Sequence, residues 1–290
     1  MRMFSLYCEN IPQTKPKMTT ATVRTTNNHN HTISSWNQTI LGAGILLLLS
    51  TIYWTQQFEN RELIQRKFWD KFYDRCSILY DSVDWFTFDA AQKLRLHVLD
   101  YLPTKSDIKK NKNGYSILEI GVGTGRLHVE IAKRFKPNQS AAESSDMDFY
   151  LAGFDMAPGM IELTRQRLVA DGNHNLKSDL RIGDVTQVLP WADESFDIVL
   201  STFALSAISD VAAACQEMSR VVKPGGKIII VDAGTARNNN RMASFLAWIW
   251  ESLGDYMRDD DEILSNLGLV VTREDFGPWD SVHITVGEKP

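Results

Sequence analysis

The sequence has little cysteine and no excess of basic charge, and each shortage excludes a class of protein. Its three cysteines, Cys8, Cys76 and Cys215, lie far apart and form no Cys-x-x-Cys pair, which argues against a disulfide framework and a structural zinc site. The 31 Lys and Arg residues are outnumbered by 36 Asp and Glu residues, which gives a formal net charge of -5. Nucleic-acid binders carry a broad basic surface, so no nucleic-acid partner is predicted.

Composition changes abruptly along the first sixty residues. Residues 10–35 are rich in Thr and Asn and show no apolar period, which predicts a disordered leader over residues 1–35. A mitochondrial presequence is the functional alternative. Residues 36–55 carry no charge and place Trp36 and Trp54 near their two ends, where indole rings favour membrane interfaces. An apolar helix of about 19 residues is roughly 28 Å long, close to the hydrocarbon thickness of a bilayer. One transmembrane anchor is therefore predicted over residues 36–55.

The charges that flank this segment predict its orientation. Only Arg24 lies before it, at some distance, whereas five basic residues follow it closely, namely Arg61, Arg66, Lys67, Lys71 and Arg75. The positive-inside rule then places the larger C-terminal part on the cytosolic or mitochondrial-matrix side. The sequence thus predicts a single-pass protein of the mitochondrial inner membrane or the endoplasmic reticulum.

The remainder of the chain alternates between helical and strand patterns. Residues 59–112 read as a helical cap that ends in a polar linker over residues 105–113, and residues 113–290 as one α/β domain. Seven strands are predicted, at 116–120, 149–154, 179–182, 196–201, 227–232, 269–272 and 282–286. Helices are expected between them near 125–135, 158–170, 208–221 and 241–264. This alternation predicts a doubly wound, mostly parallel, seven-stranded sheet.

A glycine-rich loop follows the first predicted strand. It combines Glu119 with Gly121, Gly123 and Gly125, in the pattern Glu-x-Gly-x-Gly-x-Gly. A phosphate-binding P-loop requires Gly-Lys-Ser/Thr, which is absent here. A dinucleotide-binding loop requires a third glycine at the position of Arg126. The sequence therefore matches neither type of loop. The negative charge of Glu119, just before the loop, would not favour binding of an anion such as pyrophosphate. It would favour a ligand with an ammonium and a sulfonium group, such as S-adenosylmethionine.

Four ordered motifs resemble those of the class I S-adenosylmethionine-dependent methyltransferases, which have a Rossmann-like fold. The motifs are the glycine loop, residues 153–160, residues 183–197 and residues 221–227. Within that family, the chain is most similar to the ubiquinone/menaquinone-biosynthesis C-methyltransferases, the methyltransferase type 11 group, over roughly residues 68 to 286. The resemblance implies a methyltransferase with S-adenosylmethionine as its cofactor.

The resemblance also implies roles for individual residues. Asp155, with Met156 beside it, would accept hydrogen bonds from the ribose hydroxyls, although an N-cap of the following helix is the structural alternative. Asp184 would accept from the adenine amino group beside Val185, with a turn-forming Gly-Asp pair as the alternative. Three further residues are implied to contact the cofactor: Glu119 at the methionine amino end, Thr202 after the fourth strand, and Tyr80 of the N-terminal cap. A core role for Tyr80 is the alternative.

No catalytic base or metal site stands out. His128 is expected to be a partly exposed helical residue, His97 is a weak candidate base, and no His/Cys cluster has ligand spacing. The aromatic segment 242–250 reads either as a core helix or as a lid facing a lipid or prenyl group. Together with the anchor, it favours a lipophilic small-molecule acceptor: a quinone precursor, a phospholipid headgroup or a similar molecule. A catalytically silent, cofactor-binding scaffold subunit of a membrane complex is the alternative.

Overall fold

The structure, a computed structural model, describes residues 67, 71, 73–74, 90–110, 114–135, 149–172 and 178–290. The chain divides into two units, Met1–Thr51 and Ile52–Pro290, and every described residue belongs to the second. The predicted leader (1–35), the predicted anchor (36–55) and Tyr80 therefore lie outside the described residues. Within the described ranges, no helix is both long enough and apolar enough to cross a membrane.

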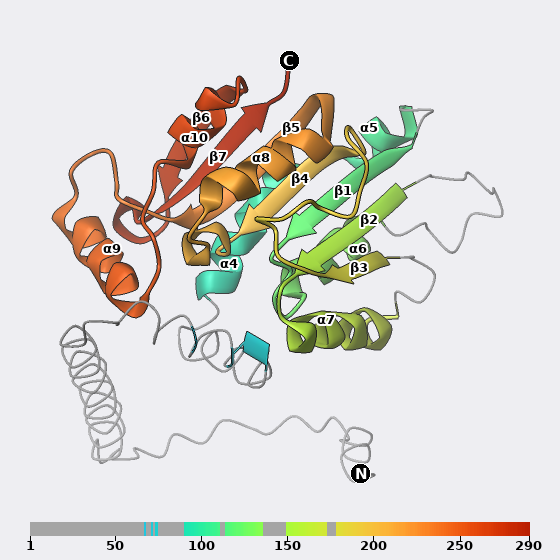
Figure 1. Ribbon diagram of the computed structural model, residues 1–290, viewed down its shortest axis with the longest axis horizontal. Coiled ribbons are helices and arrows are strands. Elements are labelled where there is room, and N and C mark those ends of the chain that lie inside the picture. The colour runs from blue at the N-terminus through green and yellow to red at the C-terminus, as the bar shows by residue number, and fades with distance from the viewer. Residues whose placement is uncertain are drawn as a thin grey trace, which may run out of the picture. The chain divides into compact units, whose positions relative to one another are not determined.

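A seven-stranded sheet forms the centre of the second unit, as predicted (Figure 1). Its order is β3-β2-β1-β4-β5-β7-β6; strands β1 to β5 run parallel, and β7 is antiparallel to both β5 and β6. The strands are β1 (Tyr115–Ile120), β2 (Phe149–Asp155), β3 (Ser178–Ile182), β4 (Phe196–Thr202), β5 (Val222–Ala233), β6 (Val270–Phe276) and β7 (Val282–Glu288). The order reverses between β1 and β4, and the carboxyl ends of strands at such a point form a crevice for ligands.

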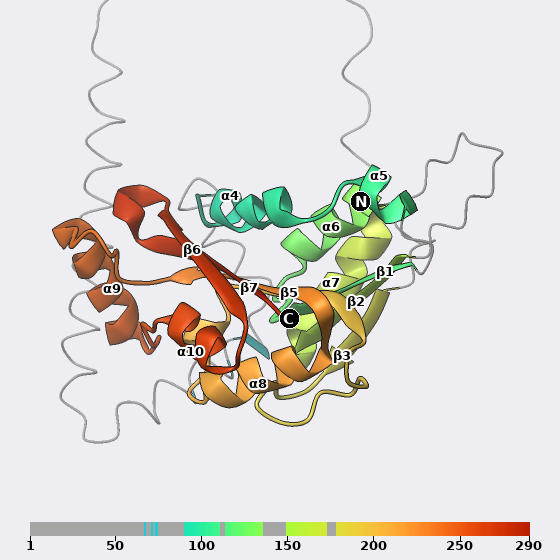
Figure 2. The same cartoon turned by 90° about the horizontal axis from the view of Figure 1, so that it is seen from above.

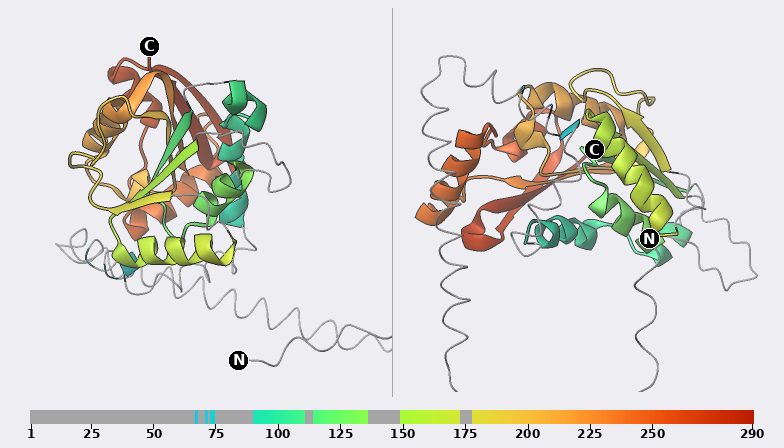
Figure 3. Two further views of the ribbon diagram at one scale, coloured as in Figure 1. Left: turned by 90° about the vertical axis from the view of Figure 1, so that its right-hand side faces the viewer. Right: turned by 90° about the horizontal axis from the view of Figure 1, so that it is seen from below.

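Helices cover both faces of this sheet because apolar residues on its central strands point to both sides. Along β1, Ile117 packs in one core cluster and Leu118 in the other. One face is covered by α4 (Ala90–Leu96), α5 (Lys105–Lys110), α6 (Arg126–Phe135) and α7 (Pro158–Ala170). The opposite face is covered by α8 (Val211–Val221) and α10 (Asp260–Asn266), as Figures 2 and 3 show from several sides. The doubly wound α/β prediction is confirmed.

The prediction of a single helix over residues 241–264 is wrong. Two helices form instead, α9 (Arg241–Leu253) and α10, with residues 254–259 between them. Gly254 ends α9 in the left-handed conformation, with φ 111°, and its N–H bonds back to the carbonyl oxygen of Glu251 at 3.1 Å. A glycine at this position is a common stop signal for a helix.

The polar segment 105–113, predicted to be a linker, contains the short helix α5. Thr104 and Asp107 make reciprocal hydrogen bonds at its start: the Asp107 N–H donates to Thr104 Oγ1 at 3.3 Å, and the Thr104 N–H donates to Asp107 Oδ2 at 3.1 Å. This is a capping-box arrangement, which satisfies backbone donors that a helix start leaves unpaired. Ile108 is buried and anchors the helix on the core.

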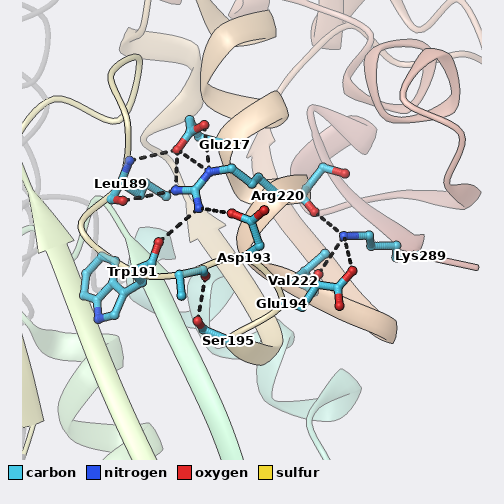
Figure 4. Close-up of polar contacts among 11 residues, drawn as sticks. Leu189, Trp191, Asp193, Glu194, Ser195, Glu217, Arg220, Val222 and Lys289 are labelled. Carbon is cyan, nitrogen blue, oxygen red and sulfur yellow. Dashed lines mark hydrogen bonds and ion pairs between the residues drawn. The ribbon is translucent and has the colours of Figure 1, made fainter.

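A cluster of polar contacts around Arg220 fixes the long loop between β3 and β4 (Figure 4). The guanidinium group of this α8 residue donates to the Glu217 carboxylate at 2.7 Å, to the Leu189 carbonyl oxygen at 3.1 Å and to the Trp191 carbonyl oxygen at 3.0 Å. Glu217 also accepts from the Leu189 N–H at 2.8 Å. Because the start of this loop borders the cavity described below, the cluster holds one wall of the site in place.

Candidate functional site

The glycine loop lies between β1 and α6, at the point where the strand order reverses. The N–H groups of Gly121 and Val122 donate to the Phe154 carbonyl oxygen of neighbouring β2 at 2.8 and 3.2 Å. Gly121 has φ +70°, and a Cβ built on it would lie 2.3 Å from the Cβ of Ala204. Glycine is therefore required here both for its backbone conformation and for the close approach of the segment after β4.

This loop forms one wall of a cavity of about 910 Å³. The cavity is lined by the carboxyl ends of β1, β2 and β4, by residues 183–186 and by residues 207–210. Residues 254–258, between α9 and α10, also line it, as do side chains that include Tyr73, Arg95 and Arg126. Its volume is within the range of cavities that hold small ligands and cofactors.

All but one of the predicted site residues that the structure describes line this cavity. Those that line it are Glu119, Gly121, Gly123, Asp155, Met156, Asp184, Val185 and Thr202. Gly125 does not; a Cβ built on it would lie 2.6 to 2.8 Å from Thr164 of α7, and its φ is +77°. Gly125 thus permits close packing of α7 on the loop rather than contact with a ligand in the cavity.

Asp155, at the end of β2, binds the backbone of the glycine loop. Its Oδ2 accepts from the Gly123 N–H at 2.8 Å, and its Oδ1 accepts from the Ala157 N–H at 2.9 Å. The N-cap of α7 is Ala157, so the alternative interpretation of Asp155 as the N-cap residue is wrong. Burial raises the pKa of Asp155, while the two N–H bonds favour its ionised form and oppose that rise. A carboxylate offers about four acceptor positions, so Asp155 retains capacity to accept from a ligand.

His128 differs from its prediction as a partly exposed residue, because its side chain is fully buried beside Glu119. Its Nδ1 lies 2.8 Å from Glu119 Oε2, and its Nε2 lies 2.6 Å from Ser178 Oγ of β3. His128 therefore fixes the side chain of Glu119, a residue that lines the cavity. The position of His128 could have predicted this burial, because it lies in the first turn of α6, directly after the glycine loop.

Asp184 adopts the turn that was its alternative interpretation. Its Oδ1 accepts from both the N–H and the hydroxyl of Thr186, at 2.9 and 2.8 Å. The side chain is exposed yet borders the cavity, and buried Val185 lies beside it. The turn role is thus present, and an additional contact with adenine stays a prediction.

The comparisons with known proteins agree with these features. The methyltransferase domain family matches residues 118–230. The ubiquinone/menaquinone biosynthesis C-methyltransferase UbiE of Geotalea daltonii is 32% identical over 130 residues, which are 45% of this chain and 50% of that protein. Residues 118–230 of this chain therefore match a methyltransferase domain, and its curated relatives are methyltransferases.

Two further comparisons define how far the likeness extends. The demethylmenaquinone methyltransferase of Mycobacterium sp. strain KMS is 29% identical over 134 residues, 46% of this chain and 53% of that protein. This methyltransferase chain thus spans about half the length of the curated relatives that it matches. A chain from the complex between the Haloferax volcanii Trm112 methyltransferase activator and a methyltransferase shares the fold, with TM-score 0.54, 19% identity, and coverage of 75% and 98% of the two chains.

The residues around the cavity fit the S-adenosylmethionine cofactor of this family. A Cβ built on Gly123 would meet only the Gly121 carbonyl oxygen, at 4.0 Å, so the loop backbone is open to a ligand there. Two carboxylates, Glu119 and Asp155, border the cavity on adjacent strands. Glu119 is placed to hold an ammonium group and Asp155 to accept from hydroxyl groups. Among the described residues, no group of three or more His, Cys, Asp and Glu side chains is arranged to hold a metal ion.

Two further segments line the cavity: the segment after β4, including Phe203, Ala207 and Ile208, and the segment 254–258 after α9, which was not predicted. These two segments are joined by a hydrogen bond from the Tyr256 N–H to the Ser206 carbonyl oxygen at 2.7 Å. They lie about fifty residues apart in the sequence, so no local pattern could have paired them.

Proposed function

We propose that this methyltransferase transfers a methyl group from S-adenosylmethionine to a lipophilic small molecule while it is tethered to a membrane. The observation that carries the proposal is the composition of the cavity. The glycine loop and the carboxylates of Glu119 and Asp155 line it together with three apolar side chains of the segment after β4, those of Phe203, Ala207 and Ile208. Apolar side chains beside a polar cofactor site suit an acceptor that has an apolar part.

Helix α9 supports an apolar acceptor because it leads directly to the cavity. Four large apolar side chains of α9 are exposed, those of Met242, Phe245, Trp248 and Trp250, and the rings of Phe245 and Trp248 stack with centroids 5.9 Å apart. Glu251, in the last turn of the same helix, borders the cavity. An exposed aromatic face next to a site entrance favours the lid interpretation over the core-helix interpretation.

The names of the relatives favour a particular class of acceptor. One is a ubiquinone/menaquinone biosynthesis C-methyltransferase and another a demethylmenaquinone methyltransferase. We infer a quinone precursor as the first acceptor to test, with phospholipid headgroups and similar lipids next. The uncharged sequence of residues 36–55 would tether the protein, with the methyltransferase domain on the cytosolic or mitochondrial-matrix side.

The protein's own contribution to the reaction is alignment and exclusion of water. When bound, S-adenosylmethionine supplies an electrophilic methyl group on a sulfonium. Glu119 would hold the amino group of the cofactor and Asp155 its ribose hydroxyl groups, which would restrict the movement of the cofactor in the cavity. Holding the reactants in line in a dry cavity lowers the barrier, since little solvent must reorganise during the transfer.

Transfer to lipids tests the proposal directly. The purified full-length protein would be incubated with methyl-labelled S-adenosylmethionine and lipid extracts from cells that lack it, with Asp155→Ala as the inactive control. The expected result is label in an apolar small molecule with the active protein only. Cofactor binding without transfer to any lipid would favour the scaffold role instead.

The tether is tested separately in the full chain. Two charges introduced by Leu47→Arg and Leu48→Arg would each cost about 2.5 to 3.5 kcal/mol at the centre of a membrane helix. We expect the variant to leave the membrane fraction after alkaline extraction, whereas the unmodified protein stays in it. An equal distribution of the two proteins would refute the tether.

A further inference from the structure

An acidic side chain, Asp255, lines the cavity from the segment between α9 and α10. It directly follows Gly254, the residue that ends α9. Among the described residues, none donates a hydrogen bond to its carboxylate; the backbone N–H of Asp255 donates to the Trp250 carbonyl oxygen at 3.1 Å. Asp255 is half-buried and receives no hydrogen bond from these residues, so its carboxylate can accept a hydrogen bond from a ligand in the cavity.

The backbone on both sides of Asp255 is firmly held. The Tyr256 N–H donates to the Ser206 carbonyl oxygen at 2.7 Å. Arg258 donates to the carbonyl oxygens of Ile208 and Ser209, at 2.6 and 2.8 Å. These bonds attach residues 254–258 to the segment after β4, which also touches Gly121 of the cofactor loop. The backbone of Asp255 is thereby held in place beside the cavity.

The charges around Asp255 favour its protonated form. Asp232, at the carboxyl end of β5, is almost fully buried, and its carboxylate accepts from the Ser206 N–H at 2.9 Å. Burial, together with the negative charge of Asp232, raises the pKa of Asp255 to about 7. The neighbouring elements also carry the buried pair Asp260–His283, at 2.8 Å. Four more of their ionisable side chains line the cavity: Asp210, Glu251, Tyr256 and Arg258. A carboxylate that titrates near neutral pH is suited to proton transfer.

We propose that Asp255 accepts the proton that a hydroxyl-bearing acceptor loses as it is methylated. This inference rests on the proposed function and adds to it a catalytic residue and an acceptor chemistry. A lone pair of the hydroxyl oxygen forms the new bond to the methyl carbon as the carbon–sulfur bond breaks. The electron pair of the broken bond stays on sulfur, which leaves as a neutral thioether. The hydroxyl proton passes to the Asp255 carboxylate and from there to solvent.

Two phenols that differ in acidity separate this role from a structural one. At pH 8, 4-nitrophenol is largely ionised and needs no base, whereas 4-methoxyphenol is not ionised and needs one. For the full-length protein we expect Asp255→Asn to slow methylation of 4-methoxyphenol by about 10²-fold or more, and that of 4-nitrophenol only a few-fold. Asp255→Glu should recover part of the loss. Glu262→Gln, which removes an exposed carboxylate of α10 outside the cavity, is the matched control.

The pH profile provides an independent readout. With 4-methoxyphenol, kcat of the unmodified protein should rise as the pH passes through about 7, because Asp255 must be ionised to accept a proton. In Asp255→Asn, kcat should no longer rise over this pH range. Three results would overturn the inference: an equal loss of methylation rate with both phenols, the same rise of kcat with pH in Asp255→Asn, or no turnover of either phenol by the unmodified protein. Calorimetry with S-adenosylhomocysteine accompanies each assay; absence of binding there would refute the proposed function itself.

Discussion

The contact between Gly121 and Ala204 predicts a large loss of stability for Gly121→Ala. A left-handed conformation costs an alanine about 1 to 2 kcal/mol. The new Cβ would also lie 2.3 Å from the Cβ of Ala204, so the segment after β4 must shift. Overpacking of this kind costs about 1 to 3 kcal/mol, so the free energy of unfolding should fall by about 2 to 5 kcal/mol. With a urea m-value near 2 kcal/mol/M, the unfolding midpoint should fall by about 1 to 2.5 M.

Two further variants separate backbone strain from the steric contact. Gly225 has a similar φ of +73°, but no atom lies within 4 Å of a Cβ built on it. Gly225→Ala should therefore show only the backbone cost of about 1 to 2 kcal/mol. Adding Ala204→Gly to Gly121→Ala should recover the steric part, as urea unfolding followed by circular dichroism would show. Equal losses for Gly121→Ala and Gly225→Ala, with no recovery, would refute the reasoning.

Three other substitutions test the site. Asp155→Ala should weaken S-adenosylhomocysteine binding at least about 10-fold in calorimetry, because it removes acceptors for the ligand and for the Gly123 N–H; unchanged affinity would exclude Asp155 from the site. His128→Leu leaves buried Glu119 without its partner and should lower the free energy of unfolding by about 3 to 5 kcal/mol. Adding Glu119→Leu should restore part of that loss, and a further drop would contradict the pairing. Asp255 has a folded-state pKa of about 7, above its unfolded value, so its ionisation destabilises the fold as pH rises from about 4 to 7. Asp255→Asn should therefore flatten the pH dependence of unfolding and raise stability at pH 8 by up to a few kcal/mol; an unchanged slope would contradict the raised pKa.

Much of the fold could be predicted because its central strands are continuous apolar runs between turn signals. The predicted strand 196–201 corresponds to β4, and the predicted helix 158–170 corresponds to α7. The break at Gly254 was missed, although the apolar pattern of the helix ends there and residues 258–262 are all charged. Glycine at a helix C-terminus was the available signal.

The cofactor side of the site was predictable because its residues follow strand ends in short motifs. The part formed by residues 254–258 was not, since it depends on contacts between distant segments, such as the Tyr256–Ser206 hydrogen bond. The burial of His128 was also missed, although its position in the first turn of α6, directly after the glycine loop, was the available signal. Pairing with Glu119 follows from the packing of α6 on the sheet.

Calorimetric titration of the purified full-length protein tests most directly whether the cavity beside the glycine loop holds a sulfonium nucleoside. We expect saturable heat with S-adenosylmethionine and with S-adenosylhomocysteine, at one site per chain, and none with NADH. No heat with either sulfur compound, together with a clear response to NADH, would contradict this assignment of the cavity.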